Sequence, residues 1–307
     1  MASRQLVGIV TGASSGFGAL IARGLAKSGH TVYAGFLQPN NDTTSVYRDA
    51  AAFSKENNCQ LRGIELNVVK DALIKAAVDK VMAQEGRIDV VVHNAVLKRS
   101  KGHMSFGPAE AFTPKQFLDM YEVNCLSCQR INRIVLPHMR RVGKGLLVWI
   151  SSSSVHGPSS PFLAPYFAAK AAQDSLAQTY AVELTQHGIE SSIVVPGAFT
   201  QGTNHFATAM KPGDVEVENE YMEGPLKGWD NVTLEGHGKI VSPDADPAAV
   251  AEAVRQIVDT EHGKRPFRVH VEFDGGGATI VNGVRDLVRE TSLTKLGLAE
   301  LLKVKSV

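Results

Sequence analysis

The chain has 307 residues, of which 44% are hydrophobic and 21% are charged, and its formal net charge is +1. This ordinary globular composition suits one large α/β domain, and a balanced charge without a long basic run argues against a nucleic-acid-binding surface. The first residues lead directly into a strand and do not have the pattern of a secretory signal. No apolar run reaches the roughly 20 residues of a membrane span. The three cysteines, Cys59, Cys125 and Cys128, fit a protein of the reducing cytoplasm.

The first predicted elements are a strand, a turn and a helix. Residues 6–10 form a continuous apolar run, as in a buried parallel strand, and lead into Thr11-Gly12-Ala13-Ser14-Ser15-Gly16-Phe17-Gly18. Glycines at such a turn let the backbone approach a pyrophosphate, and the N–H groups that open the next helix, expected over residues 16–28, point at that anion. This context predicts a dinucleotide-binding loop.

A second strand is expected over residues 31–36, and the residues at its end normally distinguish two cofactors. An acidic residue there binds the ribose 2′-hydroxyl of NAD, and an arginine accepts the 2′-phosphate of NADP. Phe36 and Leu37 occupy these positions, so the chain has neither a carboxylate that would repel the 2′-phosphate nor an arginine that would attract it. On this balance we predict NADP rather than NAD, with Arg48 in the following segment as a candidate phosphate ligand.

The middle of the chain continues with alternating elements. We expect helices over residues 45–57, 71–84 and 114–140, and strands over residues 61–66, 88–92 and 145–151. The pair Cys125-Leu-Ser-Cys128 falls inside the third of these helices. A redox or metal-binding role would need a low thiol pKa or further ligands, so we interpret both cysteines as small residues of the helix interior.

The next predicted helix, from Pro165 to about His187, carries a reactive pair. Tyr166 and Lys170 are four residues apart and hence neighbours on one helix face. A free phenol has a pKa of roughly 10, and a nearby ammonium favours the phenolate and lowers that pKa. A phenol tuned in this way can give or take a proton at the oxygen of an alcohol or carbonyl.

With the glycine-rich loop and the Tyr166–Lys170 pair in this order, the chain resembles the short-chain dehydrogenases/reductases over residues 7–197. Within that family it is most similar to the branch around retinol dehydrogenases and 17β-hydroxysteroid dehydrogenases. The resemblance implies an α/β fold in a single domain over residues 1–307, with a Rossmann-type doubly wound parallel sheet and helices on both faces. It also implies that the loop holds a nicotinamide cofactor through Gly12, Ser14, Ser15, Gly16, Phe17 and Gly18.

The same resemblance implies further cofactor contacts. Relatives carry an adenine-binding Asp at the position of Asn67, which Val68 follows, and a cofactor-lining Asn-Asn-Ala-Gly where this chain has His93-Asn94-Ala95-Val96. Residues 96–101 are therefore either a short basic insertion at the cofactor edge or a loop excursion. A proline-glycine turn at Pro196 and Gly197 precedes a threonine that touches the nicotinamide. Thr200 is the nearest threonine and Thr203 the alternative, although the usual step of five residues reaches Gln201.

Relatives also suggest the catalytic set. Tyr166 transfers the proton, Lys170 lowers the pKa of the tyrosine and binds the ribose hydroxyls, and Asn124, in a local helix kink, holds a water behind the lysine. A serine polarises the substrate oxygen. The family spacing of about 13 residues before the tyrosine selects Ser153, our prediction, whereas counting from the preceding strand selects Ser152 and alignment on Gly157 selects Ser154.

The last third of the chain is predicted to contain a lid and a tail. We expect a strand over residues 192–195, a long loop over residues 201–242 that covers the substrate in relatives, a helix over 247–260, a strand over 267–273 and a helix over 286–303 in a tail from about residue 275. The tail is expected to be a flap or a subunit contact. Apolar lid residues either line a cavity or pack the lid onto the body: Phe199, Phe206, Met210, Tyr221, Met222, Leu226 and Trp229.

The leading functional hypothesis is an NAD(P)-dependent oxidoreductase that transfers a hydride between the nicotinamide and an alcohol or carbonyl substrate, of medium size and apolar by family analogy. A second hypothesis is a cofactor-binding redox sensor or partner protein without turnover. A third keeps the fold but performs another NAD-dependent reaction, such as dehydration or epimerisation. From the resemblance we also expect a homodimer or homotetramer, in which residues 114–140 and the Tyr166 helix build the contact. We expect a cytoplasmic protein without a metal.

Overall fold

The strand β1 (Val7–Val10) lies in the middle of the sheet and is buried over its whole length. It pairs in parallel with β2 (Thr31–Phe36) on one side and with β4 (Val90–His93) on the other. Helices cover both faces of such a strand, which explains the uninterrupted run Val-Gly-Ile-Val. The computed structural model describes residues 5–37, 44–95, 104–157, 159–199, 209–273, 275 and 277–305.

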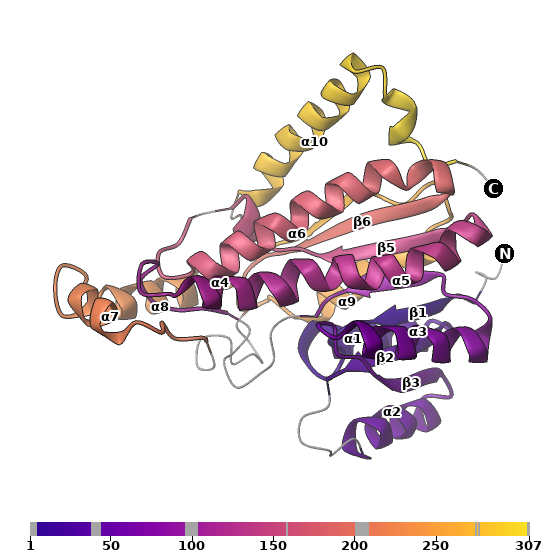
Figure 1. Cartoon of the computed structure of the whole chain (residues 1–307), viewed down its shortest axis with the longest axis horizontal. Helices are drawn as coiled ribbons and strands as arrows, with labels where there is room; N and C mark the ends of the chain where they lie inside the picture. Colours follow the sequence, from indigo (N-terminus) through magenta and orange to yellow (C-terminus); the bar gives the residue numbers. More distant parts are fainter. Residues whose placement is uncertain are drawn as a thin grey trace.

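The seven strands of the sheet are parallel and follow the order β3-β2-β1-β4-β5-β6-β7 (Figure 1). The remaining strands are β3 (Gln60–Glu65), β5 (Gly145–Ile150), β6 (Ile189–Pro196) and β7 (Arg268–Val271). The order of the chain reverses between β1 and β4, and a ligand crevice forms at the carboxyl ends of the strands at such a switch point. The predicted fold class is confirmed.

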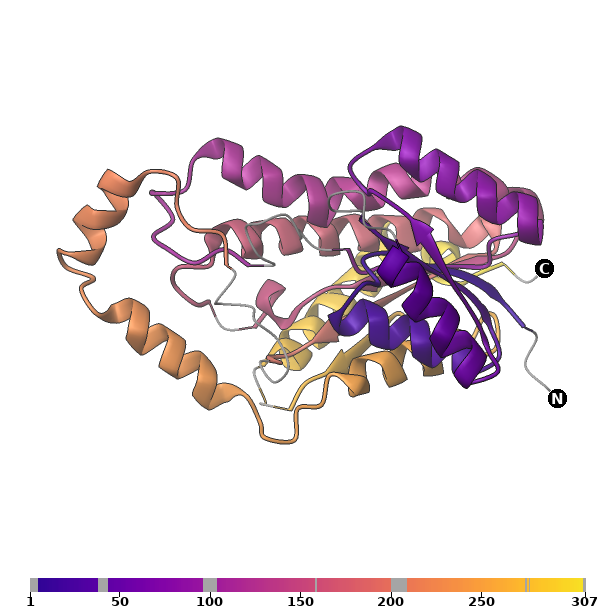
Figure 2. The same ribbon diagram turned by 90° about the horizontal axis from the view of Figure 1, so that it is seen from below.

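Helices lie on both faces of the sheet (Figure 2), and each face is covered by its own hydrophobic core. Along β5, Leu147 and Trp149 join one core, and their neighbours Leu146 and Val148 join the other, as the alternation of a strand requires. The first core contains residues of α3 (Asp71–Glu85), α5 (Ser127–Val142) and α6 (Ala164–Glu183). The second contains residues of α1 (Gly16–Lys27), α2 (Thr44–Glu56) and α9 (Ala248–Asp259).

The long helix predicted over residues 114–140 is present with an interruption. It begins as α4 (Pro114–Tyr121), where Thr113 and Gln116 form a reciprocal capping box, and it ends as α5 before Gly143, whose φ of 73° requires glycine or a similarly permissive residue. Between them, η1 (Glu122–Leu126) is a π-helix. Such a π-bulge commonly marks a functional site. The expected kink at Asn124 is therefore this π-helical segment.

Two expectations about the last third of the chain are wrong. Residues 201–242 are not only loop, because α7 (Val215–Met222) and α8 (Trp229–Ile240) lie within them. The tail helix is α10 (Ala278–Lys295), which begins eight residues before the predicted start and precedes η4 (Ala299–Leu302). The stretch Ile280-Val281-Asn282-Gly283 has low helix propensity, so no local signal indicates that the helix starts there.

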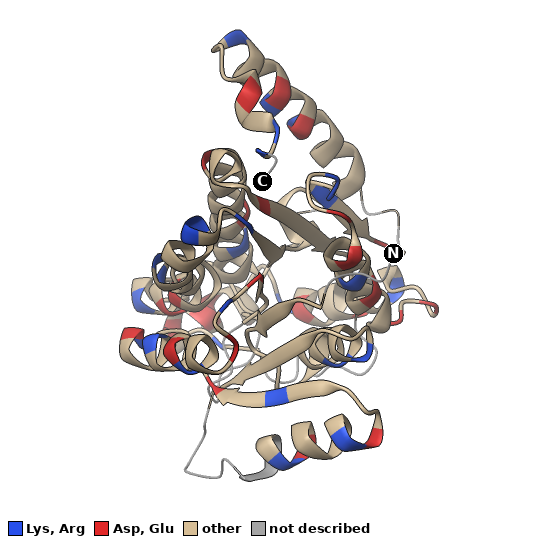
Figure 3. Cartoon of the chain, turned by 90° about the vertical axis from the view of Figure 1, so that its right-hand side faces the viewer, with Lys and Arg blue, Asp and Glu red and all other residues tan. Residues whose placement is uncertain are grey.

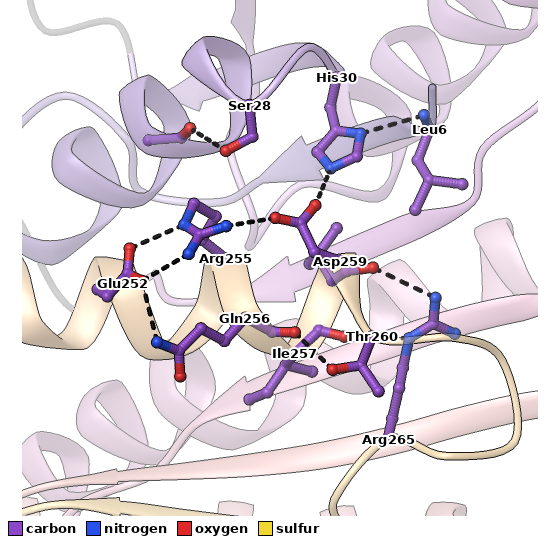
Figure 4. A network of polar contacts seen from close by, with 12 residues as sticks. Leu6, Ser28, His30, Glu252, Arg255, Gln256, Ile257, Asp259, Thr260 and Arg265 are labelled. Atoms are coloured by element: carbon purple, nitrogen blue, oxygen red, sulfur yellow. Dashed lines mark hydrogen bonds and ion pairs between the residues drawn. The ribbon is translucent and has the colours of Figure 1, made fainter. Parts of the chain in front are cut away.

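A polar network joins α9 to the junction of α1 and β2 (Figure 4). Nδ1 of His30 accepts the backbone N–H of Leu6 at 3.2 Å, so Nε2 carries the proton and donates it to Asp259 at 2.9 Å. Arg255 binds the same Asp259 at 2.6 Å and also binds Glu252. Helix α9 is thereby held on the face of the sheet that also carries the glycine-rich loop.

The outer helices carry lysines and arginines interspersed with aspartates and glutamates (Figure 3).

α6 ends at Glu183, and the chain turns through η3 (Thr185–His187) and Gly188 (φ 67°) into β6, close to the predicted helix end. Among the described helices, we find none that combines the length and the apolar character needed to cross a bilayer.

Candidate active site

The glycine-rich loop is held between two strands. The backbone N–H of Thr11 donates to Val92 at the end of β4 at 3.0 Å, and that of Ala13 donates to Gly35 in β2 at 2.8 Å. Gly12 has a φ of 65° and Gly16 a φ of 56°, conformations that favour glycine. The loop therefore turns tightly at the carboxyl end of β1, as predicted.

The start of α1 has the properties of an anion site. A Cβ built on Gly16 meets no described atom within 4 Å, and Ser14, Ser15 and Gly16 are exposed, so the space in front of this helix end is open. The first turn of α1 has no acidic residue that would repel a phosphate. The N–H groups at the start of a helix point along its dipole and favour a negative charge there. These residues fit the pyrophosphate of a dinucleotide cofactor.

Asn94 locks the loop to the end of β4. Its side-chain Nδ2 donates to the backbone oxygens of Thr11 at 2.9 Å and of Gly12 at 3.3 Å, and its backbone N–H, like that of Ala95, donates to Thr11 Oγ1 at 2.9 Å. A Cβ on Gly18 would clash with the Gly12 carbonyl and with Asn94 Nδ2. The predicted Asn94 and Ala95 thus lie against the loop, and Thr11, which was not predicted, joins them.

His93 is a core residue rather than part of the site. It is buried, its ring lies 4.5 Å from that of Trp149, and its Nε2 is 2.8 Å from Asn132 Oδ1. Burial lowers the pKa of His93 to about 4, so the imidazole is neutral at physiological pH. The departure from the family's Asn at this position is therefore accommodated inside the core.

The end of β2 carries neither charge that would select the cofactor. Phe36 is buried, with its ring 4.9 Å from that of Tyr47, and Arg48 is exposed on α2. Farther along the edge, Asn67 Oδ1 accepts the N–H of Val69 at 3.2 Å, while Val68 is buried. The suspected basic insertion at residues 96–101 lies outside the described residues.

Tyr166 lies half-buried near the start of α6, and its backbone N–H donates to Ser105 Oγ at 3.3 Å. Its ring packs with Phe112, Met120 and Met210. Burial raises the pKa of Tyr166, and a hydrogen bond with the Ser152 side chain partly opposes this rise. The direction is opposite to the expected lowering by Lys170, because loss of water around the phenol outweighs the other influences here.

The serine that contacts the phenol is Ser152. Its side chain interacts with the phenol and thereby partly opposes the rise in the pKa of Tyr166 on burial, and its Oγ accepts the N–H of Ser154 at 3.1 Å, which caps the short helix η2 (Ser153–Val155). Among the residues that the structure describes, Ser154 Oγ is buried without a hydrogen-bond partner. The geometry therefore favours Ser152 over the predicted Ser153.

Lys170 is buried one turn after Tyr166. Its Nζ donates to the backbone oxygen of Ile150 at 2.8 Å and to Gln173 Oε1 at 2.9 Å. Burial lowers the pKa of Lys170 to about 8, because the ammonium loses its water shell. Gln173 was not predicted, although its position three residues after Lys170 places it on the same helix face.

Gln173 continues a buried chain of contacts toward Asn124. Its Nε2 donates to Cys128 Sγ at 3.6 Å, and Cys128 Sγ donates to the backbone oxygen of Asn124 at 3.6 Å. Asn124 Nδ2 donates to Met120 at 2.9 Å, while its Oδ1 is buried without a partner in the described part of the chain. Lys170 and the π-helical segment are thus linked through α6 and α5.

Cys125 and Cys128 are buried free thiols. Burial raises the pKa of both thiols, that of Cys128 to about 11, so both are protonated at neutral pH. Within the described ranges no group of His, Cys, Asp and Glu side chains is arranged to hold a metal ion. The cysteines therefore belong to the interior of the helix pair.

β6 ends at Pro196, and the N–H of Gly197 donates to Val271 at 2.9 Å. Phe199 is buried there with its ring 5.3 Å from Phe17 of the glycine-rich loop. The predicted Thr200, with its alternatives Gln201 and Thr203, lies outside the described residues.

Apolar side chains form the wall beside Tyr166. Met210 packs with Tyr166, and Met222 and Leu226 pack against Phe106 and Phe162 of the body. Of the other lid residues, Tyr221 donates to Glu110 at 2.6 Å and Trp229 is 56% exposed, while Phe206 lies outside the described part. Met210 thus lies beside the phenol, and the segment with α7 is attached to the body through Met222 and Leu226.

Comparison with known proteins agrees with this geometry. Residues 7–212 match the family model of short chain dehydrogenases. A 3-ketodihydrosphingosine reductase from Bacteroides thetaiotaomicron is 29% identical over 265 residues, which cover 86% of this chain and 86% of that protein. A 4-formylbenzenesulfonate dehydrogenase from Comamonas testosteroni is 34% identical over 191 residues, 62% of this chain and 71% of that one.

Solved structures extend the likeness over nearly the whole chain. A short-chain dehydrogenase from Streptomyces avermitilis has a TM-score of 0.71 and 31% identity, over 95% of this chain and 98% of that chain. An alcohol dehydrogenase from Thermococcus sibiricus, solved with 5-hydroxy-NADP, shares the fold with a TM-score of 0.66 and 24% identity, over 88% of this chain and 97% of that chain. The chain therefore belongs to the short-chain dehydrogenase/reductase family and is an oxidoreductase of that family.

Proposed function

We propose that the protein reduces a carbonyl substrate, or oxidises the corresponding alcohol, with a nicotinamide cofactor. The observation that carries this proposal is the position of the Ser152 side chain, which interacts with the Tyr166 phenol one helical turn before Lys170 on α6. A purely cofactor-binding protein has no use for a hydroxyl pair of this kind, which places two donors beside one substrate oxygen. When bound, the nicotinamide supplies or accepts the hydride.

Each residue has a distinct role in this proposal. In reduction, Tyr166 donates its proton to the carbonyl oxygen, and its raised pKa keeps the phenol protonated at neutral pH. Ser152, rather than Ser153, donates a hydrogen bond that stabilises the developing oxyanion. Lys170 binds the ribose hydroxyls, and its positive charge favours the phenolate as the proton leaves. Asn124 holds a water that returns the proton through Lys170.

The cofactor is proposed to lie across the carboxyl ends of β1, β4 and β6. The residues proposed to hold it are Gly12, Ser14, Ser15, Gly16, Phe17, Gly18, Asn67, Val68, Asn94, Ala95, Tyr166, Lys170, Pro196, Gly197 and Thr200. We propose NADP rather than NAD, because Phe36 puts no carboxylate at the 2′ position and Arg48 is exposed on the adjacent helix.

The substrate is proposed to be of medium size and apolar. The support is the wall of Met120, Met210 and Phe112 beside Tyr166, and the similarity to a 3-ketodihydrosphingosine reductase. The branch around retinol and 17β-hydroxysteroid dehydrogenases stays a prediction. We further propose a homo-oligomer in the cytoplasm, where the three free thiols remain reduced.

The direct test is oxidation of NADPH and NADH by the purified protein with a panel of apolar ketones and aldehydes. We expect turnover with NADPH, and a decrease in kcat of about 10²-fold or more for Ser152→Ala, because one oxyanion donor is lost. Ser153→Ala is the matched control and should keep wild-type kcat within about threefold. Binding of the cofactor without turnover of any substrate would contradict the enzyme assignment and favour a redox sensor.

The contact between Gln173 and Lys170 predicts a change in pH dependence. The Gln173 oxygen stabilises the ammonium, so Gln173→Met should lower the pKa of Lys170 further below its value of about 8. A hydrogen bond to a charged group is worth about 1.5–3 kcal/mol, so the alkaline limb of kcat/KM should move down by about one to two pH units.

A second substitution at Gln173 should have the opposite effect on the pKa of Lys170. Gln173→Glu places a carboxylate beside the ammonium, raises the pKa of Lys170 and should move the same limb to higher pH. Gln178→Met is the control, because Gln178 lies on the same helix and contacts Asp174 instead. Identical pH profiles for wild type and both Gln173 variants would show that this contact does not act on the reacting pair.

A further inference from the structure

The tail of the chain forms an arm that projects from the β7 edge of the sheet (Figures 1 and 3). We call residues 278–305, which comprise α10 and η4, the arm. It returns to the body at η3, where the N–H of Lys305 donates to Thr185 at 2.9 Å and Gln186 Nε2 donates to the Glu300 backbone oxygen at 3.3 Å. The arm is therefore anchored at both ends.

The face of α10 that lies against the body is polar. Asn282 is buried and its Nδ2 is 3.0 Å from His270 Nε2, while Asp286 binds Arg268 at 3.0 Å. Arg289 lies over the ring of Phe267, 4.1 Å from its centroid. Arg285 contacts His156, next to the serine turn. These polar and charged side chains of α10 thus contact the body of the same chain.

The opposite face of α10 is apolar and exposed. Ile280, Val281, Val284, Leu287 and Val288 are 74%, 43%, 59%, 63% and 57% exposed. An ordinary surface helix has the reverse arrangement, with its apolar stripe against the core. The five side chains present on the order of 500 Å² of apolar surface, which is as large as the largest patch on a typical monomer and usually marks an interaction site.

The spacing of this stripe points to its occupant. Relative to Val284, the other four side chains stand at positions −4, −3, +3 and +4. A second copy of α10, placed antiparallel with a two-fold axis at Val284, therefore brings Ile280 opposite Val288 and Val281 opposite Leu287, while Val284 meets its own counterpart. A two-fold interface requires this self-complementarity.

We propose that two copies of this chain associate through their arms, antiparallel, about a two-fold axis that passes at Val284. Mutual burial of the two stripes removes about 1,000 Å² of surface, the lower bound for a specific interface. A membrane surface is a weaker fit, because basic residues normally flank a membrane-binding stripe and both charged residues between Ile280 and Val288 face the body. This contact is separate from the one expected over α4 to α6 and does not depend on the proposed function.

The arm also reaches the elements that carry the candidate active site. Arg268, which binds Asp286 of α10, also binds Asp174 of α6 at 3.1 Å, and both side chains are buried. Arg285 contacts His156 in the segment that follows Ser152. Association through the arm would therefore help to hold α6 and the segment after Ser152 in place, through the contacts of Arg268 and Arg285.

The first test measures the mass of the assembly by light scattering. Val284→Glu puts two carboxylates together at the axis, so the mass should fall to half that of the wild type. Val232→Glu is the matched control, since Val232 on α8 is 55% exposed and lies outside the arm. A monomeric wild type, or equal masses for wild type and Val284→Glu, would overturn the proposal.

The second test measures disulfide cross-linking in a Cys59→Ser background, which removes the one thiol that is not buried. Val284→Cys should form a covalent dimer on oxidation, because the two positions face each other at the axis. Ile280→Cys should not, since its two copies are eight residues apart along the pair, about 12 Å. The double variant Ile280→Cys, Val288→Cys should cross-link again.

The opposite pattern would overturn the antiparallel arrangement. Efficient cross-linking of Ile280→Cys alone would indicate a parallel or different pairing. Co-sedimentation with phosphatidylcholine vesicles that Val284→Glu abolishes, without any change in the mass of the assembly, would assign the stripe to a lipid surface instead.

Discussion

Replacement of Tyr166 by phenylalanine is expected to decrease kcat for carbonyl reduction by about 10²- to 10⁴-fold, because the general acid is removed. The dissociation constant of NADPH should stay within about threefold, since the glycine-rich loop and the start of α1 do not involve the phenol. The apolar Phe112, Met120 and Met210 side chains pack with Tyr166, and phenylalanine keeps the aromatic ring, so the fold should be retained. Steady-state kinetics and calorimetric cofactor titration would measure both quantities.

Tyr180→Phe is the control for this experiment. Tyr180 lies on the same helix and its hydroxyl donates to Gln129 Oε1 at 2.6 Å, so the substitution removes a hydrogen-bonded phenol hydroxyl away from the site. Its kcat should stay near that of the wild type. Wild-type turnover by Tyr166→Phe would show that the proton comes from another group, and an equal loss in both variants would point to damage of α6 rather than to chemistry.

Most of the fold could be predicted because its elements have strong local signals. β1, β2 and β5 are continuous apolar runs, as strands covered on both faces must be, and Gly86 and Gly143 end helices in the left-handed conformation. The elements that we predicted wrongly lack such signals. The beginning of α10 is rich in β-branched residues and contains a glycine, and its apolar stripe lies on the side away from the core, so neither propensity nor periodicity located the start of this helix.

The residues of the candidate site could be proposed from the sequence, but the directions of their pKa shifts could not. The order of the glycine-rich loop, Asn124, the serines, Tyr166 and Lys170 could be read from the sequence, because these motifs have fixed neighbours along the chain. The choice of Ser152 depends on how the turn after β5 meets α6. The raised pKa of Tyr166 and the lowered pKa of Lys170 depend on burial, which is a property of the assembled fold. Gln173 was missed because its hydrogen bond with Lys170 matters only once both side chains are buried, which the sequence does not show.

The second large effect is expected from Gly18→Ala, which should weaken NADPH binding by about tenfold or more and destabilise the fold by about 1–3 kcal/mol. The backbone of Gly18 does not need a positive φ, so the effect is steric. A methyl group there meets the Gly12 carbonyl and Asn94 Nδ2, and at least one of them has to move. Movement of Asn94 breaks its contact with Thr11 and releases the loop from β4.

The matched control lies six residues farther along the same helix. A Cβ on Gly24 meets no described atom within 4 Å, so Gly24→Ala should raise the stability by up to about 1 kcal/mol through helix propensity and leave NADPH binding unchanged. Thermal unfolding and calorimetric titration of the two variants separate the clash from the general effect of replacing a glycine in α1. If Gly18→Ala bound NADPH as tightly as Gly24→Ala, the close packing of the loop on Asn94 would not be what shapes the cofactor site, and the proposed position of the pyrophosphate would have to be abandoned.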